Sequence, residues 1–430
     1  MSLMSYKLDK YLLKNAKVYY PESKKIKRAS LLIIDGDIKD MNYQGDSSDI
    51  ETIDCSSFVI SPGFIDLRTH IGEPGNEDIE SICSVSRAAL AGGYTRICIL
   101  PDTTPCIDSL DLVCYMKNRI KESLINIELI GAATKNLNGT EISEIGLMSK
   151  KGVVAISDAH KILKNTQLIR NVLEYTSMFK IPYFNHTEDY DLSSNGFTHE
   201  SKFSTEMGLP ANPYISETIA IYQNIEIAKY VGGRIHIPNV SSEKSVDLIK
   251  FFKNKYSKIS ADVSPNHLGL NQEEFVDFDA VFKISPPLRS EKDSLGLIEG
   301  LRDGTIDCIV SDHFPRASES KESDLLNSKH GVIGLESAFP FCNKILSENN
   351  FRIEEILGLF TLNPSKVYNL ELGSIKAGQP ANFNVIDTNE KWVFKEENIF
   401  SKSKNSPMIG KSMKGKIKYV LCKNKIHSFD

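Results

Sequence analysis

Several polar side chains that could do chemistry stand directly after short apolar runs of the chain. They include His70, Asp158, His186 and Asp312. Imidazole and carboxylate groups can bind metal ions and can transfer protons. A lone histidine is more often a hydrogen-bonded core residue, so the chemical interpretation depends on whether the fold gathers these side chains at one place.

The elements that would position them are eight apolar runs separated by amphipathic stretches. This alternation over about 300 residues is typical of a parallel (β/α)8 barrel, an α/β fold. In such barrels the functional site lies at the carboxyl ends of the strands, which is where these polar residues stand. The runs span residues 63–66, 95–100, 127–130, 153–156, 181–185, 234–237, 259–263 and 307–310.

The two ends of the chain differ from its middle. Short β-type runs at 16–20, 30–34 and 58–61 are broken by turn signals, and a strand is expected again at 382–386. We therefore predict a small β-sandwich domain built from residues 1–62 and 365–430. The barrel then spans residues 63–364.

Several phrases along the chain resemble those of class I dihydroorotases of the amidohydrolase superfamily. Each phrase alone is weak, but their shared order covers nearly the whole chain. They are Ala91-Gly92-Gly93-Tyr94-Thr95, Pro101-Asp102-Thr103, Pro286-Pro287-Leu288-Arg289, Gly304-Thr305-Ile306-Asp307 and Gly331-Val332-Ile333-Gly334-Leu335-Glu336.

The resemblance implies hydrolysis or closure of a cyclic amide by water that zinc ions acidify. Carried over to this chain, it makes His70, Asp158, His186 and Asp312 the retained metal ligands. It also makes Asp312 the catalytic residue that takes up and returns the proton.

Two of the family's four imidazole ligands are replaced in this chain. The first His of the His-x-His pair is Arg68, and the second His of the His-x-x-His-Val-Ser phrase is Asn239. Loss of even an outer partner of a metal ligand typically lowers metal affinity or activity about 10- to 100-fold. We therefore expect at most one zinc ion, or none.

The residues that would line the substrate also differ from the family. Gly72 replaces an Arg, Asp102 and Ser285 each replace an Asn, and Arg316 replaces the last His of the Asp-His-Ala-Pro-His phrase, which also contains His313. The first change removes a carboxylate clamp, and Asp102 adds negative charge. Dihydroorotate should bind poorly.

Arg68 has a physical interpretation. A guanidinium cannot bind zinc, but its fixed charge can neutralise Asp158 and Asp312 where a cation stood. We hypothesise that Arg68 replaces the metal as a structural counter-ion.

Two functions remain open. One is a non-catalytic homologue retained for assembly; the resemblance implies aspartate transcarbamoylase as a candidate partner and a homodimer. The other is a hydrolase of dihydroorotate or another cyclic amide with one zinc ion, for which Ser285 leaves a neutral ureide ring conceivable.

Composition narrows the cellular setting. The net charge of -5, with acidic and basic residues interleaved, gives no reason to expect nucleic acid or a membrane as partner. The eight cysteines are scattered singly and no apolar stretch has the length of a signal peptide or membrane span. A cytoplasmic location is expected.

Overall fold

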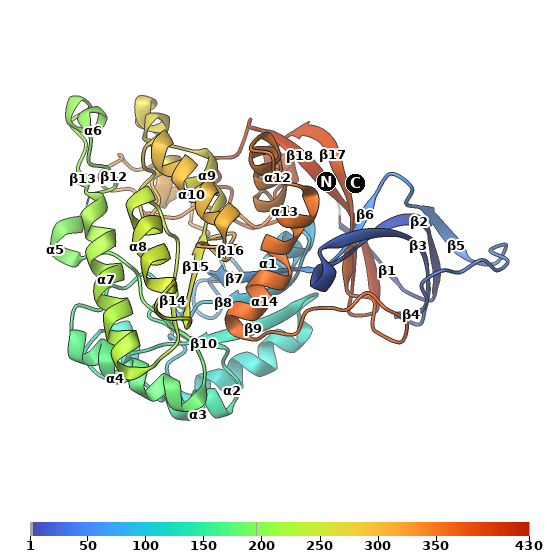
Figure 1. The fold of residues 1–430 in the computed structure, drawn as a ribbon, viewed down its shortest axis with the longest axis horizontal. Coiled ribbons are helices and arrows are strands. Elements are labelled where there is room, and N and C mark those ends of the chain that lie inside the picture. The colour runs from blue at the N-terminus through green and yellow to red at the C-terminus, as the bar shows by residue number, and fades with distance from the viewer. Residues whose placement is uncertain (1–2, 195, 430) are drawn as a thin grey trace.

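The eight predicted parallel strands form one sheet in the computed structural model, which describes residues 3–194 and 196–429 (Figure 1). Within those residues the strands pair in the order β16-β15-β14-β11-β10-β9-β8-β7. A parallel bridge between Thr69 and His313 joins the first strand to the segment after the last and closes the barrel. The strands are β7 (Phe64–Thr69), β8 (Tyr94–Ile99), β9 (Asn126–Gly131), β10 (Ala155–Ile156), β11 (Tyr183–Phe184), β14 (Ile235–Ile237), β15 (Ile259–Val263) and β16 (Cys308–Ile309).

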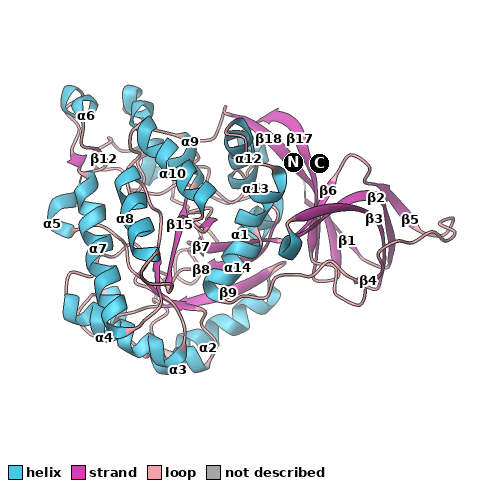
Figure 2. Ribbon diagram, in the orientation of Figure 1, coloured by secondary structure: helices cyan, strands magenta, loops and turns pink. Residues whose placement is uncertain are grey.

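Helices cover the outside of this barrel (Figure 2). Both faces of its strands are consequently buried, as the fully buried β7 illustrates. This burial explains why the strand sequences are largely continuous apolar runs. The larger helices are α1 (Ile82–Ala91), α2 (Leu110–Arg119), α3 (Ile145–Lys150), α4 (Thr166–Phe179), α7 (Tyr214–Val231), α8 (Glu243–Lys253), α10 (Glu291–Asp303), α12 (Ala338–Glu348), α13 (Ile353–Phe360) and α14 (Leu362–Tyr368).

Shorter elements lie between the strands and these helices. A pair of two-residue strands and four short helices follow strand ends: β12 (Thr198–His199), β13 (Ala211–Asn212), α5 (Tyr190–Ser193), α6 (Lys202–Glu206), α9 (Pro265–Gly269) and α11 (Glu319–Glu322). The remaining helices are short 3-10 helices: η1 (Pro21–Ser23), η2 (Ile120–Glu122), η3 (Lys135–Leu137), η4 (Gln272–Asp277), η5 (Ala280–Phe282) and η6 (Glu396–Asn398).

The two ends of the chain pair with each other beside the barrel, as predicted. β1 pairs with β19 and β6 pairs with β17, so both termini belong to one sheet (Figure 1). Its order over the described residues is β1-β19-β18-β17-β6-β2-β3-β4, with β5 beside β2. These strands are β1 (Leu3–Lys7), β2 (Lys10–Tyr20), β3 (Lys25–Ile34), β4 (Asp37–Asp40), β5 (Glu51–Asp54), β6 (Val59–Pro62), β17 (Phe383–Val393), β18 (Ser412–Cys422) and β19 (Lys425–Phe429).

The strand lengths in the structure differ from the predicted lengths. β10, β11 and β16 are two residues long, shorter than the predicted runs, whereas β2, β3 and β17 are longer. Backbone hydrogen bonds outside the short strands, such as Val154 N–H to the Leu129 carbonyl at 2.9 Å, continue the pairing into the connecting loops.

The predicted domain boundaries stay a prediction, and residues 1, 2 and 430 of the predicted end domain lie outside the described residues. Among the helices that the structure describes, none is both long enough and apolar enough to cross a bilayer.

Candidate functional site

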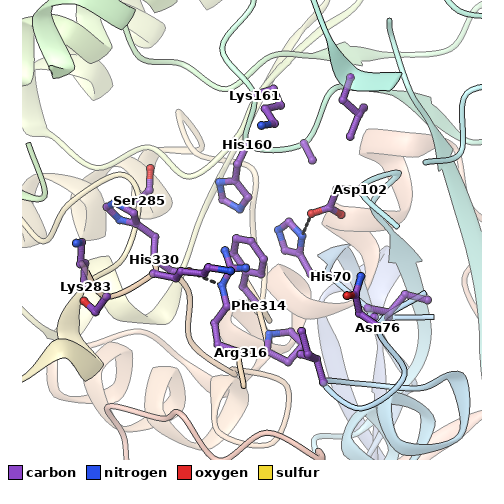
Figure 3. A pocket seen from close by; sticks show the side chains of 18 of the residues that line it. His70, Asn76, Asp102, His160, Lys161, Lys283, Ser285, Phe314, Arg316 and His330 are labelled. Atoms are coloured by element: carbon purple, nitrogen blue, oxygen red, sulfur yellow. Dashed lines mark hydrogen bonds and ion pairs between the residues drawn. The ribbon is translucent and has the colours of Figure 1, made fainter. Parts of the chain in front are cut away.

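A cavity of about 740 Å³ opens at the carboxyl ends of the barrel strands (Figure 3). Its residues come from loops that follow β7, β8, β9, β10, β15 and β16. Six of the residues singled out from the sequence line it: His70, Gly72, Asp102, Asp158, Ser285 and Arg316. Arg68, Asn239, Asp312 and His313 lie buried and are not part of this lining, and His186 lines an adjoining cavity.

Arg68 and Asp312 form a buried ion pair. Arg68 Nη2 lies 3.2 Å from Asp312 Oδ1, and the two residues are 2% and 5% exposed. Burial raises the pKa of Asp312, although the charge of Arg68 and the nearby Asn239 side chain oppose that rise. The hypothesis that Arg68 is the counter-ion of Asp312 therefore agrees with the geometry.

Asp158 is held by a loop and not by Arg68. Its Oδ1 accepts the backbone N–H groups of Ala133 and Thr134 at 2.8 and 2.9 Å, and its Oδ2 accepts the Thr134 hydroxyl. Burial raises the pKa of Asp158, against these hydrogen bonds. The part of the counter-ion hypothesis that paired Arg68 with Asp158 is therefore corrected, because backbone donors already satisfy that carboxylate.

The His70 side chain points toward Asp102. Its Nδ1 donates to Asp102 Oδ2 at 2.6 Å, while its Nε2, buried at the cavity, has no hydrogen-bond partner within the described residues. Burial lowers the pKa of His70. Burial alone would raise the pKa of Asp102, but the charge and hydrogen bond of His70 hold it below its usual value. The two side chains thus form a buried hydrogen-bonded pair at the cavity.

Aromatic rings fill the space beside His70. Phe314 stacks on His70 with ring centroids 3.6 Å apart, and the ring of His160 lies parallel to both. His160 Nε2 also lies 3.3 Å from Arg68 Nη2. Sequence reasoning missed both rings. The signal for Phe314 was present, because it stands where the dihydroorotase phrase Asp-His-Ala-Pro-His has Ala.

His186 belongs to a satisfied network beside the cavity. Its Nε2 donates to Glu188 at 2.8 Å, and Asn212 donates to the other Glu188 oxygen at 2.6 Å. Ser285 Oγ lies 3.3 Å from His186 Nε2. Burial opposes it, but these partners together with Arg289 lower the pKa of Glu188 to about 2. Glu188 was absent from the predicted site, although it follows His186 in the same strand-end phrase.

The backbone around Gly72 leaves no room for a side chain. A Cβ at this position would lie 1.8 Å from the Asn76 carbonyl oxygen and 2.8 Å from that of Glu80. The Asn76 and Glu80 turn has therefore closed over the place from which an Arg side chain would start. The backbone of this loop therefore excludes an Arg side chain at position 72, independently of which residue the sequence has there.

A second buried set surrounds Asn239 and His313. Asn239 N–H donates to Asp262 at 2.6 Å, but its side-chain amide makes no hydrogen bond of normal geometry to any residue the structure describes. His313 Nε2 lies 3.5 Å from Glu80. Both residues are fully buried and do not line the cavity.

These residues do not fit the zinc centre that the resemblance implies. Zinc needs several imidazole or carboxylate ligands directed at one point. Across the described residues, no group of three or more His, Cys, Asp or Glu side chains is arranged to hold a metal ion. The retained carboxylates and His186 instead face Arg68, a backbone turn and Glu188.

Comparisons with known proteins agree on one family. Residues 59–426 match the amidohydrolase family. The chain is 39% identical over 419 residues to a dihydroorotase of Caldicellulosiruptor saccharolyticus, covering 96% of this chain and 97% of that protein. It is 34% identical over 413 residues to a dihydroorotase of Aquifex aeolicus, covering 96% and 97%.

A solved structure supports the fold. The L-hydantoinase (dihydropyrimidinase) of Arthrobacter aurescens superposes with a TM-score of 0.83 at 21% identity, covering 96% of this chain and 94% of that one. The chain therefore belongs to the amidohydrolase family, and its similarity over nearly its whole length is to members named dihydroorotase.

Proposed function

We propose that the protein is a dihydroorotase homologue of pyrimidine biosynthesis that does not hydrolyse dihydroorotate and acts as a non-catalytic subunit. The observation that carries this proposal is the buried Arg68–Asp312 ion pair. The residue that would return the proton is paired with a guanidinium, which cannot bind water as a ligand and so cannot acidify it as zinc does.

The residues that would line the substrate support the same function. Gly72 has no space for the clamp side chain, and the Phe314 ring stacks on His70 beside the cavity. Restoring activity would therefore require changes to both loops, and no single ligand replacement should suffice.

We infer that such a subunit serves assembly, with aspartate transcarbamoylase as the candidate partner and a homodimer as the candidate state. An exposed apolar face on α7 supports a protein interface: Ile219, Tyr222 and Tyr230 are 46%, 53% and 77% exposed. A cytoplasmic location is part of the proposal, and the eight free cysteines support it.

The test is dihydroorotate hydrolysis by the full chain with and without added Zn²⁺, beside the relative from Caldicellulosiruptor saccharolyticus. We expect no turnover by this chain under either condition. Zinc-dependent turnover that falls in Asp312→Asn would contradict the proposal and favour the alternative, a hydrolase of dihydroorotate or another cyclic amide with one zinc ion.

Assembly is tested separately by size-exclusion chromatography of the chain alone and mixed with the aspartate transcarbamoylase of the same organism. Co-elution that is lost in Tyr222→Glu would support both the partner and the α7 face. Separate elution at every concentration would remove aspartate transcarbamoylase as the partner.

A further inference from the structure

A second cavity, of about 320 Å³, lies at the amino ends of the barrel strands. Its lining includes Arg234, Lys258 and Asp307, which directly precede β14, β15 and β16. The candidate functional site is lined by residues that follow the strands, so the two cavities open at opposite ends of the barrel. Catalytic residues of such barrels stand at the carboxyl ends, so this second cavity is suited to binding without chemistry.

Three cationic side chains line this second cavity. Arg234 and Lys258 stand at neighbouring strand ends, because the Ile235 N–H donates to the Lys258 carbonyl at 3.0 Å. The Arg234 guanidinium also contacts α14, where its Nη2 donates to the Val367 carbonyl at 2.7 Å. Lys366, the preceding residue of α14, is the third cation of the lining. Three separate segments of the chain therefore place positive charge around one recess.

The protein does not neutralise this positive charge. Among the residues that the structure describes, none of the three cations forms an ion pair with a carboxylate. The carboxylate of the lining, Asp307, accepts the Lys253 ammonium at 2.6 Å and the Ala261 N–H at 2.7 Å, so it is already engaged. An excess of one sign of charge in a recess concentrates ligands of the opposite sign, although the whole chain has a net charge of -5.

Hydrogen-bond donors of these cations remain available for a ligand. Arg234 donates through Nη2, and its Nε and Nη1 make no hydrogen bond within the described chain. Lys258 donates once, to the Gly232 carbonyl at 2.7 Å, and the exposed Lys366 makes no side-chain hydrogen bond to the described residues. Burial lowers the pKa of Arg234, as it does for a half-buried guanidinium that lacks a carboxylate partner. A bound anion would supply that partner.

We propose that this second cavity binds the phosphate group of a small molecule and bridges β14, β15 and α14 through it. A phosphate carries about two negative charges and three acceptor oxygens, which suits a guanidinium fork flanked by the ammonium groups of Lys258 and Lys366. A single carboxylate would leave part of this charge unpaired. The cavity is at the lower end of the range of small-molecule sites, about 300–1,000 Å³. The inference is independent of the proposed function, because it concerns the other end of the barrel.

Isothermal titration calorimetry of the full chain with three probes tests it: inorganic phosphate, glycerol 3-phosphate and acetate. We expect saturable binding of at least one of the two phosphates, weakened by added salt, and binding of acetate at least about 10-fold weaker. Equal affinity for the two phosphates would identify the free ion as a sufficient ligand, and preference for the ester would identify a phosphorylated metabolite. Failure of both phosphates to saturate, or equal binding of acetate, would overturn the proposal.

Variants locate the bound phosphate. Arg234→Gln should weaken binding at least about 10-fold, the size of one lost charge-assisted hydrogen bond. Arg234→Lys keeps the charge but loses the fork, so its affinity should fall between those of Arg234→Gln and the wild type. Binding that is lost in Arg316→Gln but unchanged in Arg234→Gln would place the phosphate in the cavity at the carboxyl ends and overturn the proposal.

A double variant keeps the test valid if Arg234→Gln does not fold. Lys258 and Lys366 are both exposed, so Lys258→Gln with Lys366→Gln should fold and should weaken binding about 3- to 10-fold. The matched control is Lys25→Gln with Lys27→Gln on β3, which removes the same charge from exposed positions and should leave affinity unchanged. Equal affinity for phosphate in the two double variants would overturn the proposal.

Discussion

Two sets of buried polar side chains inside the barrel differ in how completely they are hydrogen bonded. Asp66 accepts the Ser311 N–H and hydroxyl at 2.6 and 2.9 Å and the Thr69 hydroxyl at 2.5 Å. His236 uses both ring nitrogens, toward Ser260 at 2.9 Å and Asp262 at 2.8 Å. These residues hold neighbouring strands together, and every polar group has a partner.

The hydrogen bonding of the set in and beneath the cavity lining is incomplete. Arg68 Nε, His70 Nε2 and both side-chain amide atoms of Asn239 are buried without a hydrogen-bond partner in the described chain. Native structures leave few buried polar groups unpaired. The difference teaches that the first set is completed by the strands it joins, whereas the second set leaves polar atoms that the fold itself does not satisfy.

The largest expected effect comes from breaking the ion pair of the incomplete set. Arg68→Met should lower the free energy of unfolding by about 3–5 kcal/mol, because it leaves Asp312 buried and unpaired. Arg68→Met with Asp312→Leu should recover most of that loss. The control is Arg170→Met on exposed α4, whose pair with Glu174 should be worth less than about 1 kcal/mol.

Urea unfolding of the four proteins gives the comparison. A decrease in the free energy of unfolding below about 1 kcal/mol in Arg68→Met would contradict the counter-ion hypothesis. Removing one partner of a buried ion pair is expected to cost about 3–5 kcal/mol.

The hydrogen-bonded network of Glu188 should make the stability of the protein depend on pH. The pKa of Glu188 is lowered from 4.5 to about 2 in the folded chain, so its contribution is present above about pH 4.5 and is lost as pH falls toward 2. That shift corresponds to roughly 3 kcal/mol. The stability difference between wild type and Glu188→Gln should therefore shrink over this range in urea titrations. A difference independent of pH would mean that His186 and Asn212 do not stabilise the charged form.

The smallest expected effect concerns the closed turn at Gly72. Gly72→Ala should lower the free energy of unfolding by about 1–3 kcal/mol, because its methyl group would meet the Asn76 carbonyl. Gly358→Ala is the control: it lies in α13, where the nearest atom to an added Cβ is the Tyr19 hydroxyl at 3.3 Å. Tolerance of Ala at position 72 with no change in melting temperature would show that the turn opens easily.

Much of the scaffold could be predicted from the sequence. Continuous apolar runs follow from burial of both strand faces, so the eight strands and their order were visible, and so was the pairing of the two ends. Six of the residues singled out from the sequence line the cavity, because a strand end fixes where the next side chain lies.

The orientation of side chains could not be predicted. Asp158 and His186 both stand at strand ends, yet Asp158 turns to a backbone loop and His186 to Glu188. The partners of Asp158 come from a separate loop, and that of His186 lies two residues along the chain, so no single local pattern encodes both orientations. The lysines of the cavity lining, Lys161, Lys283 and Lys329, were missed because the loops that carry them have no periodic signal.

Zinc content per chain tests the central claim most directly, measured by mass spectrometry on freshly purified protein after incubation with Zn²⁺ and removal of loosely bound ions. If the Arg68 guanidinium has replaced the metal, zinc should remain well below one ion per chain and should be the same in Asp312→Asn and His186→Ala. About one ion per chain in the wild type, lost in both variants, would contradict the account and assign these residues to a working mononuclear site.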